Sequence, residues 1–206
     1  MILSESGRQK FGALVKRSGK TPAVLSDSVF NSIADTEEPT GIAAEIALPA
    51  SAIDLKTSKS CVFLEGIQDA GNVGTILRSA SAFGVRYAVL GKGCADAWSP
   101  KVLRAGMGAH FSMQLQEIAD LAVAMAQFNG KVACTVVRGG KALKDADLSG
   151  RIGWIFGAEG KGVSEALAAR AALKVTIPMP GGTESLNVAA AAAICFYEFS
   201  RRAARA

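Results

Sequence analysis

The chain has 206 residues, of which 50% are hydrophobic and 20% are charged, so it can bury a sizeable core and is not intrinsically disordered. It shows no collagen, coiled-coil or low-complexity period, and its length suits one large domain with a short appendage. Its 23 Lys and Arg residues against 18 Asp and Glu residues give a net charge of +5, which is compatible with a nucleic-acid partner but does not require one.

Residues 1–50 differ in pattern from the rest and predict a small αβ appendage. Within them, residues 24–30 and 42–48 have the composition of short strands, with Pro39 and Gly41 as breakers between them. The small and polar stretch that follows predicts a linker at residues 51–60. The remaining residues, 61–206, then form the larger unit.

Strand-like and helix-like segments alternate from Cys61 onward. This alternation predicts an α/β fold with a mostly parallel sheet that is covered by helices on both faces. Ligands of such sheets bind beyond the carboxyl ends of the strands, which here are followed by loops at residues 65–75, 157–162 and 178–185. The predicted strands are residues 61–64, 86–90, 111–115, 132–137, 152–156 and 173–177. The predicted helices are residues 72–83, a short helix opened by Ser99 and Pro100, and residues 118–128, 163–170 and 186–202.

The beginning of the last predicted helix, residues 186–196, is apolar on nearly every side and consists mostly of Ala. A helix of this kind must be buried on all sides, and one face of a sheet cannot cover it completely. We therefore expect a second subunit to pack against it, with burial inside a single chain as the alternative.

The first loop leads into the helix at residues 72–83, and its glycines permit unusual backbone dihedrals. Arg78 lies about 200° around this helix from Ile76, at roughly 100° per residue, and points away from the centre of the apolar stripe. A solvated helix charge is the alternative to a functional role for Arg78, and an ordinary N-cap is the alternative for Asn72. The stripe consists of Ile76, Leu77, Ala80 and Phe83.

The second loop contains Gly157, Gly160 and Gly162 in the spacing GxxGxG. This is neither the dinucleotide fingerprint GxGxxG nor a P-loop, so another class of nucleotide-binding α/β protein lacks its signature. A tight turn with a solvated Glu159 is the alternative reading. In the third loop, Pro and Gly precede the Ala-rich helix, which Thr183 or Ser185 could cap.

The four cysteines, Cys61, Cys94, Cys134 and Cys195, form no CxxC pair, so we expect buried, reduced thiols. Because His110 is the only histidine, we expect neither a zinc site of the usual Cys/His kind nor a Ser-His-Asp triad, and we expect no metal. The N-terminus lacks a signal-peptide core, although its basic residues leave a transit peptide as an alternative. No apolar stretch is long enough to cross a bilayer, so we expect a cytoplasmic protein without a membrane partner.

Together and in this order, the three loops resemble the signature motifs of the SpoU (TrmH-like) RNA 2′-O-ribose methyltransferases of the SPOUT superfamily. The resemblance covers about residues 60–200, and residues 1–50 are similar to a shortened L30e-like substrate-binding domain. The matching motifs are Asn72-x-Gly74-x3-Arg78, then Gly157-x-Glu159-Gly160-x-Gly162, then Ile177-Pro178-Met179 followed by Ser185-Leu186-Asn187-Val188.

The resemblance implies a C-terminal deep trefoil knot that forms the S-adenosylmethionine pocket, and a homodimer with its active site near the subunit interface. Periodicity by itself does not show a knot. The motif positions assign cofactor contacts to Thr135, Gly157, Ile177 and Leu186. They assign catalytic or substrate-orienting roles to Asn72, Arg78, Glu159, Ser185 and Asn187.

The activity implied is methyl transfer from S-adenosylmethionine to a ribose 2′-hydroxyl of RNA, with rRNA favoured over tRNA. A non-catalytic RNA-binding or ribosome-assembly protein on the same fold is the alternative. Because Arg stays protonated, we expect Arg78 to stabilise the developing alkoxide rather than to act as a base. Basic residues near the two ends are candidates for contacts with RNA phosphates, with a solubility surface as the alternative. They are Lys10, Lys16, Arg17, Lys20, Arg201, Arg202 and Arg205.

Overall fold

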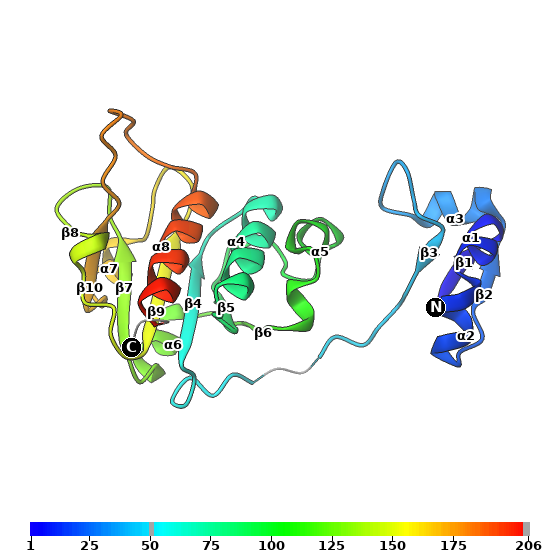
Figure 1. Cartoon of the computed structure of the whole chain (residues 1–206), viewed down its shortest axis with the longest axis horizontal. Helices are drawn as coiled ribbons and strands as arrows, with labels where there is room; N and C mark the ends of the chain where they lie inside the picture. Colours follow the sequence, from blue (N-terminus) through cyan, green and yellow to red (C-terminus); the bar gives the residue numbers. More distant parts are fainter. Residues whose placement is uncertain (50–51, 204–206) are drawn as a thin grey trace. The chain divides into compact units, whose positions relative to one another are not determined.

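The computed structural model describes residues 1–49 and 52–203, and the chain divides into two compact units, Met1–Ala50 and Ser51–Ala206 (Figure 1). The described part of the first unit contains a three-stranded sheet in the order β2-β1-β3, in which β1 pairs parallel with β2 and antiparallel with β3. The strands are β1 (Ile2–Ser4), β2 (Ala23–Leu25) and β3 (Ile42–Ala43), and the helices are α1 (Glu5–Lys10), α2 (Gly12–Ser18) and α3 (Asp27–Ile33).

The predicted strands of the first unit are both too long. Ser26 ends the first of them, because its hydroxyl accepts a hydrogen bond from the amide of Val29 and starts α3 instead. In the second, β3 stops after Ala43, and the apolar side chains of Ile46 and Leu48 are 66% and 60% exposed. Apolar residues in a short segment therefore did not indicate a buried strand here.

The second unit is built on a sheet whose seven described strands have the order β6-β5-β4-β9-β7-β10-β8. Every neighbouring pair in this sheet is parallel, which confirms the predicted mostly parallel sheet. The strands are β4 (Ser60–Glu65), β5 (Tyr87–Leu90), β6 (Gln114–Glu117), β7 (Lys131–Thr135), β8 (Lys141–Ala142), β9 (Ile152–Gly157) and β10 (Leu173–Thr176).

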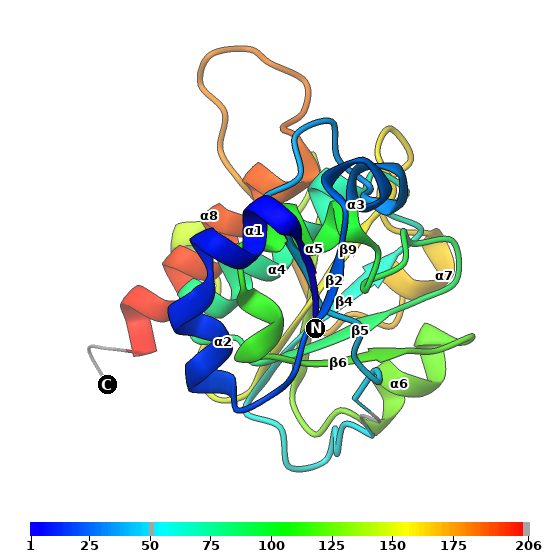
Figure 2. The same ribbon diagram turned by 90° about the vertical axis from the view of Figure 1, so that its right-hand side faces the viewer.

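Helices cover both faces of this sheet, as predicted (Figure 2). On one face, α4, α5 and α8 enclose a core that includes Trp154 and Phe156 of β9. On the other face, α6 and α7 enclose a core that includes Ile155, because successive side chains of a strand point to opposite faces. The helices are α4 (Ala70–Ala82), α5 (Pro100–Gly106), α6 (Leu121–Gln127), α7 (Glu165–Ala168) and α8 (Val188–Ala203), with short 3-10 turns η1 (Ala109–Phe111) and η2 (Leu143–Asp145).

The described residues of the predicted linker, 52–60, pack onto the second unit. Ile53 and Leu55 are 8% and 5% exposed within the core beneath α6. The amide of Ile53 also donates a hydrogen bond of 3.2 Å to the side chain of Gln116 in β6. This stretch is therefore an integral part of the second unit.

One predicted strand, residues 111–115, is misplaced. Its first residue, Phe111, ends η1 with its side chain 97% exposed, and β6 begins at Gln114. The turn at this point begins at Gly108, which has a φ of 86°, and a hydrogen bond from the amide of Ser112 to the carbonyl of Ala109 closes it. Local hydrogen bonds therefore decided the conformation against the apolar pattern.

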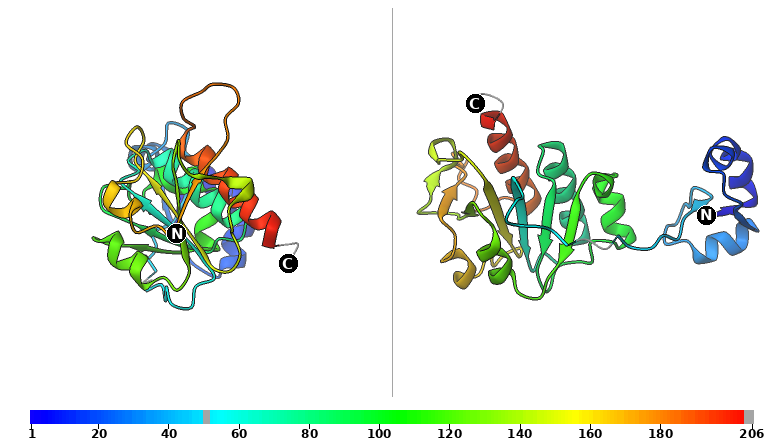
Figure 3. Two further views of the ribbon diagram at one scale, coloured as in Figure 1. Left: turned by 90° about the vertical axis from the view of Figure 1, so that its left-hand side faces the viewer. Right: turned by 90° about the horizontal axis from the view of Figure 1, so that it is seen from below.

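The last helix, α8, lies beside α4 on one face of the sheet, as two further views show (Figure 3). Ala192, Cys195 and Phe196 are fully buried, whereas Ile194 and Tyr197 are 40% and 55% exposed. The alternative of burial inside a single chain is therefore wrong, because the sheet and α4 cover only part of the helix, and the expected second subunit stays a prediction. All four cysteines are free, and Cys61, Cys134 and Cys195 are buried as expected, whereas Cys94 is only partly buried. Burial raises the pKa of the Cys134 thiol to about 11.

Candidate active site

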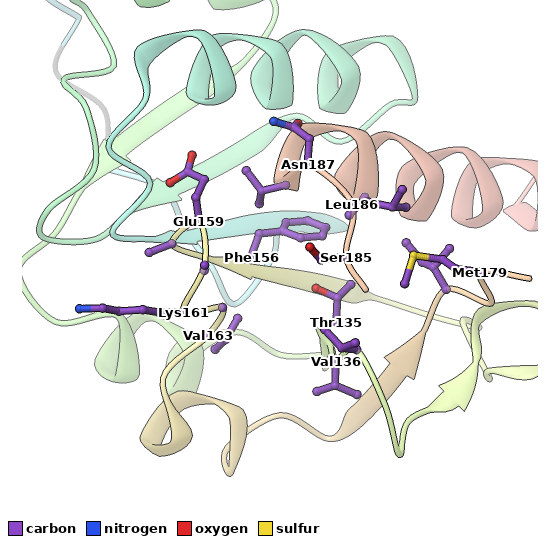
Figure 4. Close-up of a pocket in the computed structure, with 18 residues that line it drawn as sticks. Thr135, Val136, Phe156, Glu159, Lys161, Val163, Met179, Ser185, Leu186 and Asn187 are labelled. Atoms are coloured by element: carbon purple, nitrogen blue, oxygen red, sulfur yellow. The ribbon is translucent and has the colours of Figure 1, made fainter. Parts of the chain in front are cut away.

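Three loops at the carboxyl ends of neighbouring strands enclose a cavity of about 530 Å³ (Figure 4). The loops follow β7, β9 and β10, which are adjacent in the sheet and thus bring distant segments of the chain to one edge. The wall combines apolar side chains with a few polar groups. The lining residues are Thr135, Val136, Val137, Phe156, Gly157, Ala158, Glu159, Gly160, Lys161, Gly162, Val163, Ile177, Met179, Ser185, Leu186, Asn187, Val188 and Ala191.

The loop after β9 is a tight turn that requires glycine. A Cβ atom on Gly157 would lie 2.1 Å from the carbonyl oxygen of Gly162, and this contact involves backbone that cannot easily move. The amide of Gly162 donates a 2.8 Å hydrogen bond to the carbonyl of Ala158, and the φ angles of Gly160 and Gly162 are 80° and 69°. The three glycines therefore shape the wall of the cavity.

Asn72 stands in the first turn of α4, but it does not cap this helix. The carboxylate of Asp69 is the cap and accepts a 2.7 Å hydrogen bond from the amide of Asn72. The side chain of Asn72 is thus available, and its Nδ2 donates a 2.7 Å hydrogen bond to Oε1 of Glu159. The N-cap alternative for Asn72 is therefore wrong.

Asn187 occupies the N-terminus of α8 and caps it. Its Oδ1 accepts hydrogen bonds from the amides of Ala189 and Ala190, at 2.8 and 3.2 Å. The expected caps, Thr183 and Ser185, lie too early in the chain for this role. The Nδ2 of Asn187 donates a 3.0 Å hydrogen bond to Oδ1 of Asn72.

These contacts join the three motif loops in one hydrogen-bonded series, which we call the Glu159–Asn72–Asn187 chain. The helix amides require the oxygen of Asn187, so its NH2 group must face Asn72. Asn72 then meets Asn187 with its oxygen and Glu159 with its NH2 group. Every orientation in the series is consequently determined, and Figure 4 shows Glu159 and Asn187 on the side of the cavity next to α4.

Gly74 serves packing between helices rather than an unusual dihedral. A Cβ atom at this position would lie 2.5 Å from the Cβ of Ala105 and 2.6 Å from the carbonyl oxygen of Val102. Its φ is not positive. In the loop before α4, the expected unusual dihedral is found at Gly66, with a φ of 63°, and not at Gly71. The missing side chain of Gly74 lets α5 approach α4 closely.

The structure brings most of the sequence-predicted site residues to the cavity, and Arg78 is the exception. Seven line the cavity, and Asn72 reaches it through its hydrogen bonds. Arg78 is exposed on α4, and within the described chain it has no hydrogen bond or ion pair. The lining set is Thr135, Gly157, Glu159, Ile177, Ser185, Leu186 and Asn187.

Several lining residues were missed by the sequence analysis. Phe156 ends a strand that was predicted as plain core, and Val136 follows β7. Ala191 could have been found, because it lies four residues after Asn187 and thus on the same face of α8. Met179 and Val188 belong to the quoted motifs but carried no assigned role.

The basic residues near the C-terminus bind the protein itself. Glu198 accepts hydrogen bonds from Arg201 at 2.8 Å and from Arg202 at 2.7 Å. Arg202 also donates to the carbonyl groups of Leu143 and Ala146, and so ties α8 to η2. The guanidinium group of Arg202 is therefore engaged within the chain, and Arg205 lies outside the described residues.

Among the described residues, no group of three or more His, Cys, Asp or Glu side chains is placed to hold a metal ion. In the same part of the chain, no helix combines the length and the apolar character needed to cross a membrane.

Comparison with known proteins places this geometry in context. The family model described as "SpoU rRNA Methylase family" matches residues 59–197. The 23S rRNA (guanosine(2553)-2′-O)-methyltransferase RlmP of Bacillus subtilis is 35% identical over 176 residues, which cover 84% of this chain and 70% of that protein.

Two solved structures share the fold. A protein from Porphyromonas gingivalis, assigned to the TrmH family of RNA methyltransferases, has a TM-score of 0.83 and 33% identity, and the match covers 98% of this chain and 81% of that chain. An AdoMet-bound rRNA methyltransferase from Sinorhizobium meliloti has a TM-score of 0.80 and 25% identity, with 98% and 79% of the two chains covered.

Proposed function

The chain belongs to the SpoU rRNA methylase family, and from this premise we propose that it transfers a methyl group from S-adenosylmethionine to a ribose 2′-hydroxyl of RNA. The observation that carries this proposal is the Glu159–Asn72–Asn187 chain, which joins the three motif loops beside one cavity. The B. subtilis and S. meliloti relatives are named as rRNA methyltransferases, which favours rRNA over tRNA as the substrate.

The residues of the cavity suit S-adenosylmethionine. The volume of about 530 Å³ lies in the range of roughly 300–1,000 Å³ that is usual for small-molecule pockets. Phe156, Ile177 and Leu186 offer apolar surface for an adenine ring, and the carboxylate of Glu159 stands at a wall that would face a cationic ligand. When bound, this molecule supplies an electrophilic methyl group on a sulfonium centre.

The protein's own contribution is alignment, charge stabilisation and proton removal. The leaving thioether is neutral, so the site needs no acid. Asn72 and Asn187 hold the carboxylate of Glu159 in one position, with one oxygen engaged and the other available as an acceptor. Arg78, which stays protonated, stabilises the developing alkoxide and binds the adjacent phosphate.

A homodimer completes this site in our proposal, because Arg78 does not reach the cavity of its own chain. The exposed apolar side of α8, which includes Ile194 and Tyr197, lies beside α4 and offers a self-complementary surface. Pairing through this surface would bring Arg78 of the partner subunit toward the substrate. It would also cover the apolar residues that the isolated chain leaves exposed.

The family resemblance adds three further points to the proposal. The segment through β10 and α8 forms a deep trefoil knot, the unit Met1–Ala50 is a shortened L30e-like substrate-binding domain, and the protein acts in the cytoplasm. The presence of both helices and strands in the first unit supports the second of these points.

Two measurements test the proposed function. Calorimetry with S-adenosylmethionine is expected to show binding by wild type, whereas a different nucleotide-binding protein would show none. Methyl transfer from tritiated S-adenosylmethionine to rRNA of a deletion strain is expected for wild type and not for Arg78→Ala. Cofactor binding without transfer to rRNA or tRNA would instead identify a non-catalytic RNA-binding protein.

The variant Arg78→Lys examines the role of the guanidinium group. Lysine retains the charge but lacks the planar donor fork, so we expect turnover to fall well below that of wild type across the pH range. Turnover near the wild-type value would eliminate a special guanidinium role.

A further inference from the structure

Three exposed apolar side chains lie on α5, at its C-terminal cap and on η1. Leu103, Met107 and Phe111 follow one another at intervals of four residues, and their side chains are 39%, 69% and 97% exposed. Phe111 is the most exposed large apolar side chain in the described part of the protein. We call these three residues, together with Lys101 and Arg104 of the same helix, the α5 surface.

Met107 is held in a conformation that normally favours glycine. It has a φ of 46° at the C-terminal end of α5, and no other non-glycine residue among those described has a positive φ. Such a backbone costs stability unless glycine occupies the position. The residue at this position is nevertheless a methionine whose side chain is mostly exposed, which indicates a role for the side chain.

The groups around Phe111 are rigidly positioned. The hydroxyl groups of Ser112 and Ser81 lie 2.7 Å apart, which ties the end of η1 to α4. The Nε2 of His110 lies 2.7 Å from the carbonyl oxygen of Ala97, and its ring packs against Trp98. The exposed aromatic ring thus projects from a fixed backbone, so binding a partner would not require this turn to become ordered.

Few acidic residues lie in the segment that carries this surface. Residues 70–116 carry five Lys or Arg side chains and one acidic side chain, Asp96, and Asp69 and Glu117 bound this segment. It forms α4, β5, α5 and η1 at the β6 edge of the sheet. A single strand of nucleic acid offers bases that can stack on an aromatic ring and phosphates that can bind cations. The five basic residues are Arg78, Arg86, Lys92, Lys101 and Arg104.

We propose that the α5 surface binds a single-stranded segment of the RNA, with one base stacked on Phe111 and phosphates beside Lys101 and Arg104. That this RNA is the substrate rests on the proposed function. Asn72, in the first turn of α4, lies beside the cavity, and α4 meets the turn of Phe111 at Ser81, about 14 Å further along at 1.5 Å per residue. The stacked base is therefore not the methylated nucleotide but one further along the strand.

The variant Phe111→Ala tests the stacking, with Val123→Ala as its control. Val123 is also exposed, at 48%, but lies on α6 on the opposite face of the sheet. The probe is a fluorescein-labelled 20-nucleotide single-stranded RNA of mixed sequence, and the readout is fluorescence anisotropy. We expect Phe111→Ala to weaken binding about tenfold and Val123→Ala to stay within about twofold of wild type. Calorimetry with S-adenosylmethionine should give wild-type affinity for both variants, which shows that the fold is intact.

Two further variants separate a binding role from a structural one. Met107→Gly relieves the backbone, so Tm is expected to rise by about 2–4 °C while RNA affinity falls.

Lys101→Ala is expected to reduce the slope of log affinity against log salt by about 0.7, whereas Lys59→Ala, which removes a cation before β4, should leave the slope unchanged.

RNA affinity within about twofold of wild type for both Phe111→Ala and Met107→Gly would overturn the proposal, and so would failure of wild type to bind the probe. If the two variants retain RNA affinity but lower the oligomer mass in sedimentation, a second copy of the chain covers this surface instead. Failure of the proposed function is distinguishable. In that case wild type would transfer no methyl group, while RNA binding would still depend on Phe111.

Discussion

The side-chain amide of Asn187 donates a hydrogen bond of 3.0 Å to the side-chain oxygen of Asn72, although 115 residues separate the two in the sequence. The oxygen of Asn187 simultaneously caps α8, and the NH2 group of Asn72 binds Glu159. One pair of amides therefore links the start of two helices to the carboxylate at the cavity. Loss of Asn187 should affect both the start of α8 and the position of Glu159, whereas loss of Asn72 should affect Glu159 alone.

Replacement of Asn187 by Ala is expected to lower stability and activity together. The helix α8 loses its N-cap, at a cost of about 1 kcal/mol, and Asn72 loses its donor. Thermal unfolding should show a Tm about 2–4 °C below wild type. Methyl transfer should fall about tenfold or more because Glu159 is no longer held through Asn72.

The variant Asn187→Asp separates these two effects. Asp caps a helix as well as Asn does, so stability should remain near wild type. Its carboxylate cannot donate to Asn72 and would instead oppose the oxygen of that side chain. Full methyl transfer by Asn187→Asp would show that the Glu159–Asn72–Asn187 chain has no role in the reaction.

The variant Gly157→Ala is expected to close part of the cavity. Its Cβ would lie 2.1 Å from the carbonyl oxygen of Gly162, so the turn must shift into the space it lines. Calorimetry should show affinity for S-adenosylmethionine reduced about tenfold or more, on the basis that small displacements of a preorganised site are costly. The control is Gly181→Ala, where nothing lies within 4 Å of the added atom, and unchanged affinity is expected there.

The variant Gly74→Ala is expected to destabilise the second unit without touching the cavity. The new methyl group would meet Ala105 and the backbone of Val102, and the separation of α4 from α5 should cost about 1–3 kcal/mol. Urea unfolding of Thr75→Ala, which alters an exposed neighbour in the same helix, provides the comparison and should differ from wild type by less than about 0.5 kcal/mol. Equal stability of the two variants would contradict the close packing of α4 and α5.

The stability provided by Glu198 is expected to depend on pH. Hydrogen bonds from Arg201 and Arg202 hold the pKa of this carboxyl below its ordinary value of 4.5. Because the pKa is lower in the folded state, the contribution of the Glu198 carboxylate to stability is complete above about pH 4.5. This contribution is lost as the pH falls through the pKa of the folded state. The Tm of Glu198→Gln should therefore lie below that of wild type at pH 7, and the difference should shrink in acid.

A matched replacement checks that this pH effect is local. Glu184→Gln removes an exposed carboxylate from the loop before α8 and should leave Tm close to wild type at pH 7. If the deficit of Glu198→Gln persists unchanged at pH 3, the carboxylate is not the origin of the stabilisation.

The alternation of apolar strands and amphipathic helices was sufficient to predict the parallel sheet, its two covered faces and most of its elements. These features depend on which side of each element is buried, and periodicity reports that directly. Prediction failed where local hydrogen bonds competed with apolar pattern, as at Ser26 and in the turn before Gln114. It also failed for the caps, because several neighbouring side chains could have served and only the geometry of the helix ends selected Asp69 and Asn187.

By itself, the sequence determined the fold class and the family motifs, because short-range spacing carries both, and through the motifs it indicated seven of the residues that line the cavity. Only the tertiary structure decided that Asn72 meets Asn187, that Gly74 admits α5, and that Arg78 lies outside the cavity of its own chain. These relationships depend on strand order and on the packing of helices remote in sequence. Such distances follow from the whole core, and no local pattern of residues encodes them.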